Sequence, residues 1–213
     1  MEVDHIVPVK AVSHNFLYRL MVPPEGVNSL SNLVPACHKC NRRKGSKNAG
    51  RTREDGRKRM RLLLQRVREG KVAIEGQNVA SIGKGLVVLV GFGPEDTLDL
   101  RGGKLWNTLI EKMVVLRIFP DDEGKMNRGI EEAGGEIILV SQFTLYADSR
   151  KGRRPSFHLS APPGVAEPLF QHFVEDVRTR LPGRVQQGVF AADMDVSLTN
   201  WGPVTILLDS ADF

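Results

Sequence analysis

A polar segment that could carry out catalysis follows an apolar run in the second half of the chain. Residues 137–140 are Ile-Ile-Leu-Val, and Ser141, Gln142, Phe143 and Thr144 come directly after them. A short continuous apolar run predicts a buried strand, so the polar segment should lie at the end of that strand. There its backbone N–H groups can point into a pocket and stabilise a negative charge that develops during a reaction.

The usual groups of nucleophilic hydrolases are sparse around this segment. Residues 60–213 contain no cysteine and two histidines, His158 and His172. We interpret His172 as a helix-surface residue, and the sequence offers His158 no evident Ser or Asp partner. With no G-x-S-x-G motif either, a Ser-His-Asp triad is unsupported. Thr144 as a covalent nucleophile is the alternative, although the sequence shows no base to activate it.

The beginning of the chain carries a different set of chemical groups. It holds Asp4-His5, Asn32 and a Cys37-x-x-Cys40-Asn41 stretch. This pattern resembles the HNH endonuclease family, whose ββα-metal fold places such groups around one divalent cation. The resemblance implies that His5 is the base, that Asn32 orients it, and that Asp4 and Asn41 hold the cation.

Cys37 and Cys40 look like half of the zinc site found in many HNH proteins. A structural zinc ion needs four ligands, and only three residues precede Asp4, so the other cysteine pair is missing. We therefore interpret residues 1–45 as a truncated, degenerate HNH-like segment, and the resemblance implies zinc as the metal ion that Cys37 and Cys40 would bind. Two alternatives stay open: a metal-dependent nuclease, and a basic arm that binds RNA.

Three longer motifs lie in the remainder of the chain. They are Ser141–Ala147 (SQFTLYA), Arg153–Phe157 (RRPSF) and Asn200–Thr205 (NWGPVT). Together they resemble the D-aminoacyl-tRNA deacylase family, and the resemblance covers residues 60–213. It implies hydrolysis of the ester that links a D-amino acid, or mischarged glycine, to tRNA, as chiral proofreading in translation. It also implies a homodimer with a cross-subunit active site, and no cofactor for deacylation.

The same resemblance assigns roles to individual residues. Ser141, Gln142 and Thr144 would form the reaction site, with Thr144 against the scissile ester. Residues that would bind the substrate are Phe143, Phe190, Met194, Gly202 and Pro203. The Gly202–Pro203 pair would be cis and would enter the other subunit's pocket, where its rigid backbone excludes an L side chain. Trp201 departs from the family, which more often has a small acidic residue there.

A basic cluster follows the SQFTL motif. Lys151, Arg153 and Arg154 lie close to it in the chain, while residues 60–213 as a whole carry 18 Lys+Arg against 20 Asp+Glu. A slightly acidic unit that binds a polyanion needs a local positive surface. We therefore predict that these three residues contact tRNA.

The elements that must position these groups follow from hydrophobic spacing. Apolar residues at helical spacing predict one helix within 96–119, starting after Gly102-Gly103, and a second over 165–177. Apolar runs predict strands on both sides of Glu69-Gly70 and at 86–92, 137–142, 185–189, 195–198 and 204–208. Because helices do not separate the strands regularly, we predict an α+β fold with a barrel-like mixed β-sheet and two main helices.

Charge divides the chain at about residue 60. Residues 1–59 carry 12 Lys+Arg against 5 Asp+Glu, so the basic character belongs to the first quarter of the chain. We predict three parts: the HNH-like segment 1–45, a basic linker 46–59 and a deacylase domain 60–213. The sequence shows no secretory signal and no apolar stretch long enough to span a membrane. It therefore predicts a cytoplasmic protein with no membrane partner.

Overall fold

A computed structural model of the chain describes residues 60–150 and 152–213. The predictions made for residues 1–59 and for Lys151 lie outside these described residues. They include the HNH-like segment and the linker, together with Asp4, His5, Asn32, Cys37, Cys40 and Asn41.

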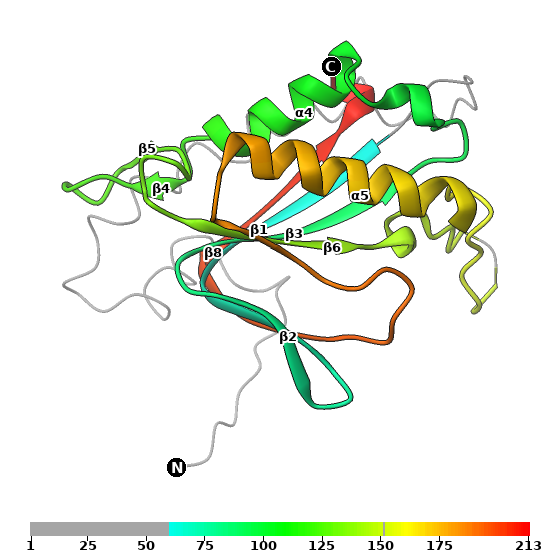
Figure 1. Ribbon diagram of the computed structural model, residues 1–213, viewed down its shortest axis with the longest axis horizontal. Coiled ribbons are helices and arrows are strands. Elements are labelled where there is room, and N and C mark those ends of the chain that lie inside the picture. The colour runs from blue at the N-terminus through cyan, green and yellow to red at the C-terminus, as the bar shows by residue number, and fades with distance from the viewer. Residues whose placement is uncertain (1–59, 151) are drawn as a thin grey trace, which may run out of the picture. The chain divides into compact units, whose positions relative to one another are not determined.

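The described residues form a mixed sheet with helices between its strands (Figure 1). The strands are β1 (Met60–Ile74), β2 (Gln77–Ile82), β3 (Gly85–Phe92), β4 (Phe119–Pro120), β5 (Met126–Arg128), β6 (Glu136–Ser141), β7 (Val185–Gln187) and β8 (Asp195–Asp209). The α-helices are α4 (Lys104–Val115) and α5 (Pro163–Arg180), and the 3-10 helices are η4 (Leu98–Leu100), η5 (Phe143–Tyr146) and η6 (Ser210–Asp212).

Strand β1 organises the six-stranded sheet. Its first half pairs antiparallel with β3, its second half pairs antiparallel with β2, and β8 pairs antiparallel along nearly its whole length. Strands β3, β6 and β7 follow one another in parallel. Since residues of β1 that pair with β3 also pair with β8, β8 lies on the other edge of β1. The sheet is therefore mixed and barrel-like, which confirms the predicted fold class.

Two apolar clusters bury the two faces of this sheet. On one face, α4 and α5 lie side by side over β1, β3 and β6 (Figure 1). The rings of Trp106 from α4 and Phe173 from α5 meet there edge to face, with centroids 5.2 Å apart. The other cluster contains Val67, Val87 and Ile138 together with residues of β2. Burial on both faces explains why β3 and β6 are continuously apolar rather than alternating.

Both predicted helices are confirmed. Helix α4 starts at Lys104, directly after the Gly102-Gly103 pair, and places Trp106, Leu109 and Met113 in the core. Helix α5 covers the predicted 165–177 range and extends it at both ends. The spacing of apolar residues located these elements because each helix buries one stripe against the sheet.

Two strand predictions are wrong. Residues 60–74 form one strand rather than two around Glu69-Gly70, because the backbone continues through Gly70 while β1 exchanges its partner from β3 to β2. Residues 195–198 and 204–208 are likewise parts of one strand, β8. Residues 201–204 form a bulge within the strand, and the spacing of apolar residues suggests a break there.

Candidate active site

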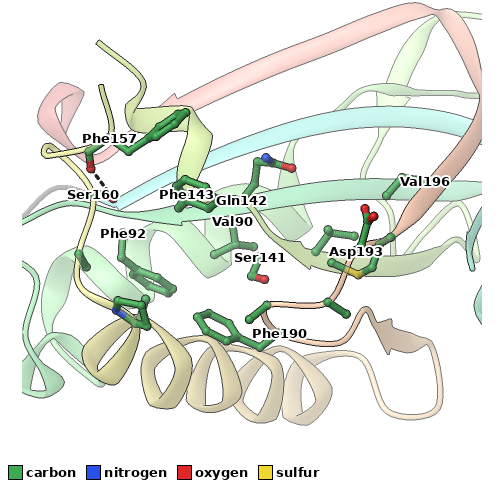
Figure 2. A pocket seen from close by; sticks show the side chains of 18 residues that line it. Val90, Phe92, Ser141, Gln142, Phe143, Phe157, Ser160, Phe190, Asp193 and Val196 are labelled. Atoms are coloured by element: carbon green, nitrogen blue, oxygen red, sulfur yellow. Dashed lines mark hydrogen bonds between the residues drawn. The ribbon is translucent and has the colours of Figure 1, made fainter. Parts of the chain in front are cut away.

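A pocket of about 610 Å³ opens at the carboxyl ends of β3 and β6 (Figure 2). Because these two strands are parallel neighbours, with Val90 opposite Ser141, their ends reach the same edge of the sheet. The loop before α5, the first turn of α5 and the loop before β8 complete the wall. Its lining residues are Val90, Gly91, Phe92, Val140, Ser141, Gln142, Phe143, Phe157, Ser160, Ala161, Pro163, Ala166, Phe190, Ala191, Ala192, Asp193, Met194 and Val196.

The polar segment after β6 is held tightly against β3. The Gln142 backbone N–H donates to the Val90 carbonyl at 2.7 Å. A side chain at Gly91 would place its Cβ 3.0 Å from the Gln142 carbonyl oxygen and 3.0 Å from the Tyr146 ring. Glycine fits this close approach of η5 to β3, because a Cβ here would require the Gln142 carbonyl or the Tyr146 ring to shift.

Arg61 anchors η5 from the other side. Its guanidinium donates to the Leu145 carbonyl at 2.8 Å, forms an ion pair with Asp209 at 2.7 Å, and lies 4.5 Å from the centre of the Tyr146 ring. A charged residue in the alternating strand β1 thereby fixes the turn that carries the reactive segment. Sequence reasoning missed Arg61 and Asp209, because an exposed-face charge on a strand gives no signal of its partner.

The loop 188–194 forms the wall opposite β6. Phe190 lies between Ser141 and helix α5 in Figure 2, with its ring 6.4 Å from that of Phe170. A side chain at Gly188 would come within 2.7 Å of the Met194 sulfur, so glycine here lets Met194 pack into place. Ala191 has a φ of 58°, a left-handed conformation that is uncommon for a residue other than glycine. Such backbone strain is often found at functional sites.

Five of the predicted site residues come together in this pocket. Ser141, Gln142 and Phe143 line one side, and Phe190 and Met194 line the other. The two groups are far apart in the chain, so the fold brings them together.

Thr144 lies next to the pocket but is not among its lining residues. The side chain is exposed, and the Gln142 side-chain amide donates a hydrogen bond to its hydroxyl. The described residues give Thr144 no base within hydrogen-bond distance. This arrangement suits a group that meets a bound substrate at the mouth of the pocket better than an activated nucleophile.

Gly202 and Pro203 lie in a bulge of β8, away from this pocket in the same chain. Gln65 pairs with Thr205 and Val67 pairs with Asn200, so residues 201–204 loop out opposite Arg66. The peptide bond between Gly202 and Pro203 is cis, as the resemblance implies, and both residues are exposed. With a φ of 137°, Gly202 occupies a region that side chains rarely allow.

Arg66 supports this bulge from inside the sheet. It is 6% exposed, donates to the Trp201 carbonyl at 2.9 Å, and also donates to the Ile118 carbonyl. Burial lowers the pKa of the Arg66 guanidinium, and the nearby charge of Arg68 lowers it further. A buried arginine is rare. The position of Arg66 among apolar residues of β1 is the feature of the sequence from which a role near the site could have been inferred.

Of the predicted tRNA-contacting residues, Arg153 and Arg154 lie in the exposed segment 152–158. Arg150 binds the Asp148 carboxylate through two hydrogen bonds of 2.8 Å, which hold the pKa of Asp148 well below its ordinary value. Arg153 and Arg154 are exposed, and in the part of the chain that the structure describes their side chains form no ion pair or hydrogen bond. Their charges are therefore available to a ligand.

His158 differs from the prediction, because it does have a serine partner. The Ser156 hydroxyl lies 2.8 Å from His158 Nδ1. Both residues are exposed and neither lines the pocket. Since Arg150 already binds the nearby Asp148 carboxylate, the arrangement does not form a Ser-His-Asp triad.

Among residues 60–150 and 152–213, no group of three or more His, Cys, Asp or Glu is placed to hold a metal ion. No helix within the same ranges is long and apolar enough to cross a membrane.

Comparison with known proteins identifies the family of this fold. The family model described as D-Tyr-tRNA(Tyr) deacylase matches residues 63–209. The chain belongs to the D-Tyr-tRNA(Tyr) deacylase family. The match confirms the predicted family and spans every residue of the pocket, together with the Gly202–Pro203 bulge.

Curated relatives align with this chain over nearly their own full length. The D-aminoacyl-tRNA deacylase of Solidesulfovibrio magneticus is 62% identical over 153 residues, which are 72% of this chain and 97% of the relative. The D-aminoacyl-tRNA deacylase of Nitratidesulfovibrio vulgaris (strain DP4) is 56% identical over 153 residues, covering 72% of this chain and 94% of the relative.

Solved structures share the deacylase fold. One described as a c-Myc DNA Unwinding Element Binding Protein has a TM-score of 0.64 and 37% identity, and the match covers 70% of this chain and 97% of that one. A probable eukaryotic D-amino acid tRNA deacylase has a TM-score of 0.57, with 71% and 99% covered. At 22% identity the second likeness shows the fold alone.

The beginning of the deacylase chain matches a second family model. Residues 1–47 match the model described as HNH endonuclease, which confirms the predicted kinship of this segment.

Proposed function

We propose that the pocket at the ends of β3 and β6 hydrolyses the ester of D-aminoacyl-tRNA, a proofreading activity that removes D-amino acids and mischarged glycine from tRNA. The observation that carries this proposal is the union of Ser141, Gln142 and Phe143 with Phe190 and Met194 in one pocket, within the segment that matches the deacylase family. The enzyme is thus a carboxylic ester hydrolase. Because aminoacyl-tRNA is used in translation, we place it in the cytoplasm.

The reaction needs little from the side chains. Water adds to the carbonyl carbon of the ester, the bond to the ribose 3′ oxygen breaks, and free amino acid and tRNA leave. The ester is intrinsically labile, so positioning and stabilisation of the oxyanion are sufficient catalysis. Backbone N–H groups of Phe143 and Thr144 supply that stabilisation in our proposal, because the Gln142 N–H already donates to the Val90 carbonyl. The Ser141 and Thr144 hydroxyls and the Gln142 amide orient the ester, and the ribose 2′-hydroxyl assists.

Substrate binding in this proposal uses the aromatic rings around the pocket. Phe143 is 53% exposed and packs edge to face against Phe157, with ring centroids 5.0 Å apart. Phe190 and Met194 form the facing wall. Large exposed rings at the mouth of a pocket are typical of sites that stack on an adenine base or an amino-acid side chain.

Selection against L-amino acids would come from Gly202 and Pro203 of a second subunit. In one chain the pair is exposed on β8, the strand that forms an outer edge of the sheet over 15 residues. Leu207 on the same strand is 53% exposed. A long edge strand with exposed apolar side chains favours pairing with another chain. We therefore propose a homodimer in which each Gly202–Pro203 pair enters the partner's pocket.

The pocket assignment is tested by filling the pocket. Ala166 lines it from the first turns of α5, so an Ala166→Trp side chain would occupy the substrate's volume. We expect the rate of D-tyrosyl-tRNA hydrolysis by the full chain to fall at least about tenfold. Glu167→Trp, on the exposed side of the same helix, is the matched control and should keep the wild-type rate. Equal rates for wild type and Ala166→Trp would place the reaction elsewhere.

Arg153 and Arg154, together with Lys151, are proposed to contact the phosphates of the tRNA. Each arginine bound to a phosphate releases a counterion, so binding weakens with salt in proportion to the number of phosphates bound. For the double variant Arg153→Gln/Arg154→Gln we expect the slope of log affinity against log salt concentration to decrease by about one for each arginine replaced. Fluorescence anisotropy with uncharged tRNA measures this slope. Arg178→Gln, an exposed change on α5, should leave it unchanged, and an unaltered slope in the double variant would remove these arginines from the tRNA interface.

A second candidate function belongs to residues 1–47, because these match the HNH endonuclease model. In our proposal this segment serves as an RNA-binding arm, because of its excess of basic residues, and not as a nuclease. Plasmid cleavage in Mg²⁺ by the full chain, lost in a His5→Ala variant, would instead establish the nuclease.

A further inference from the structure

The bulge that carries Gly202 and Pro203 is held by an aromatic residue and two arginines. Trp201 is half-buried, and the guanidinium carbons of Arg66 and Arg68 each lie 4.7 Å from the centre of its ring. The Phe119 ring meets the indole edge to face, with centroids 6.4 Å apart. Cations packed on an aromatic face are attracted by the negative potential of the ring.

We propose that Trp201 is a positioning residue for the deacylation reaction, acting through Arg66 and Arg68 to fix the backbone of Gly202 and Pro203. The inference rests on the proposed function, in which Gly202 and Pro203 exclude L-amino acids from the pocket. Trp201 itself does not touch the ester.

The geometry explains why the indole is needed. Arg66 Nη2 would lie 2.9 Å from a Cβ at Gly202, so the position of this guanidinium limits where the Gly202 backbone can lie. Arg66 and Arg68 carry like charges close together, and the charge of Arg68 contributes to lowering the pKa of Arg66. The indole contacts both cations, so the contact with Arg68 helps to hold the ring, and the ring in turn packs on Arg66. Without the indole, Arg66 keeps its hydrogen bonds to the Trp201 and Ile118 carbonyls but loses the ring that packs on its guanidinium beside Gly202.

The other end of the bulge has its own support. The Asn200 side chain accepts a hydrogen bond from the Val204 N–H at 2.8 Å and donates to the Thr205 hydroxyl at 3.2 Å. These bonds do not involve Trp201. Loss of the indole should therefore shift the bulge while β8 stays paired with β1, and the effect should appear in turnover rather than in folding.

The test compares Trp201→Ala and Trp201→Phe in the full chain, with D- and L-tyrosyl-tRNA as substrates. For Trp201→Ala we expect kcat for D-tyrosyl-tRNA to fall about 100-fold, as for a displaced positioning group. KM should stay within about threefold, and the ratio of D to L hydrolysis should fall. Trp201→Phe keeps an aromatic face for both arginines, so its kcat should stay within about fivefold of wild type.

A milder variant covers the case in which Trp201→Ala does not fold. Arg68→Gln removes one cation from an exposed position, and we expect kcat to fall about two- to fivefold at constant KM. Arg178→Gln on α5 is the matched control and should not change either constant.

The results separate the inference from the function on which it rests. If wild-type protein hydrolyses D-tyrosyl-tRNA selectively but a folded Trp201→Ala variant keeps its kcat and selectivity, the positioning role is wrong. The same conclusion follows if Trp201→Phe loses as much as Trp201→Ala, or if Arg68→Gln equals wild type. If wild-type protein shows no selectivity, the proposed function fails before any variant is measured, and the inference falls with it.

Discussion

Replacing Gly202 by alanine is expected to lower kcat/KM for D-tyrosyl-tRNA by about 100-fold or more, with the fold retained. Gly202 has a φ of 137°, which side chains rarely allow. An added Cβ would also lie 2.8 Å from Val204 Cγ2 and 2.9 Å from Arg66 Nη2. The bulge must therefore change shape, and a filter made of backbone loses its function when its backbone moves.

Steady-state hydrolysis of D- and L-tyrosyl-tRNA measures this effect, and circular dichroism checks the fold. Gly164→Ala is the matched control, because an added Cβ there meets nothing within 4 Å. It should leave kcat/KM within about twofold of wild type. A folded Gly202→Ala variant with wild-type activity toward both substrates would show that the bulge has no part in catalysis or selection.

The same variant tests whether the bulge acts in its own chain or in a partner. Gly202→Ala keeps an intact pocket, and Ala166→Trp keeps an intact bulge. In a cross-subunit arrangement, mixed dimers of the two variants rebuild one complete site. An equal mixture refolded together should recover about one quarter of the wild-type activity, since about half of the dimers are mixed and each has one of two sites. No recovery would contradict the shared site.

Replacing Phe173 by alanine is expected to reduce the free energy of unfolding by about 3–5 kcal/mol. Phe173 is fully buried and packs against Trp106, which joins α5 to α4 over the sheet. The Trp106 indole N–H donates to Asp176 on α5 at 2.9 Å, so the packing and this hydrogen bond depend on the same pair of helices. Removing the ring leaves a cavity that well-packed neighbours cannot fill.

Urea denaturation followed by circular dichroism measures the change. Val115 of α4 is 47% exposed, so Val115→Ala is the matched control. It should alter the free energy of unfolding by no more than about 0.5 kcal/mol. Phe173 does not line the pocket, but it belongs to α5, whose first turns do. The Phe173→Ala variant should therefore lose hydrolytic activity only at temperatures where the protein unfolds. A loss of less than about 1 kcal/mol would mean that the two helices do not share one core.

The helices and the fold class were predictable because single elements leave periodic patterns. Trp106, Leu109 and Met113 recur on one face of α4, and Leu169, Phe173 and Val177 do so on α5. The strand boundaries were less predictable. Strand β1 continues through Gly70, and β8 continues through a bulge, because pairing with distant strands and not local apolar spacing decides where a strand ends.

The candidate site was predictable in its parts and not in its geometry. The resemblance to the deacylase family led to Gln142, Phe190 and Met194, which the fold brings together in one pocket. The sequence around Arg61 does not indicate that its side chain donates a hydrogen bond to Leu145 of η5, 84 residues away. Nor does the sequence around Arg66 indicate that this residue binds the Trp201 carbonyl beside Gly202. These interactions depend on strand register, which a single sequence does not reveal.

The most direct measurement is the rate of hydrolysis of D-tyrosyl-tRNA and of L-tyrosyl-tRNA by the full wild-type chain in the presence of EDTA. We expect the D ester to be hydrolysed at least about 100-fold faster than the L ester, because the proposed filter excludes one position of the side chain. Activity should not depend on divalent cations, since the proposed reaction uses only the backbone and neutral side chains around Gln142. Equal rates for the two enantiomers, or hydrolysis that EDTA abolishes, would contradict the account.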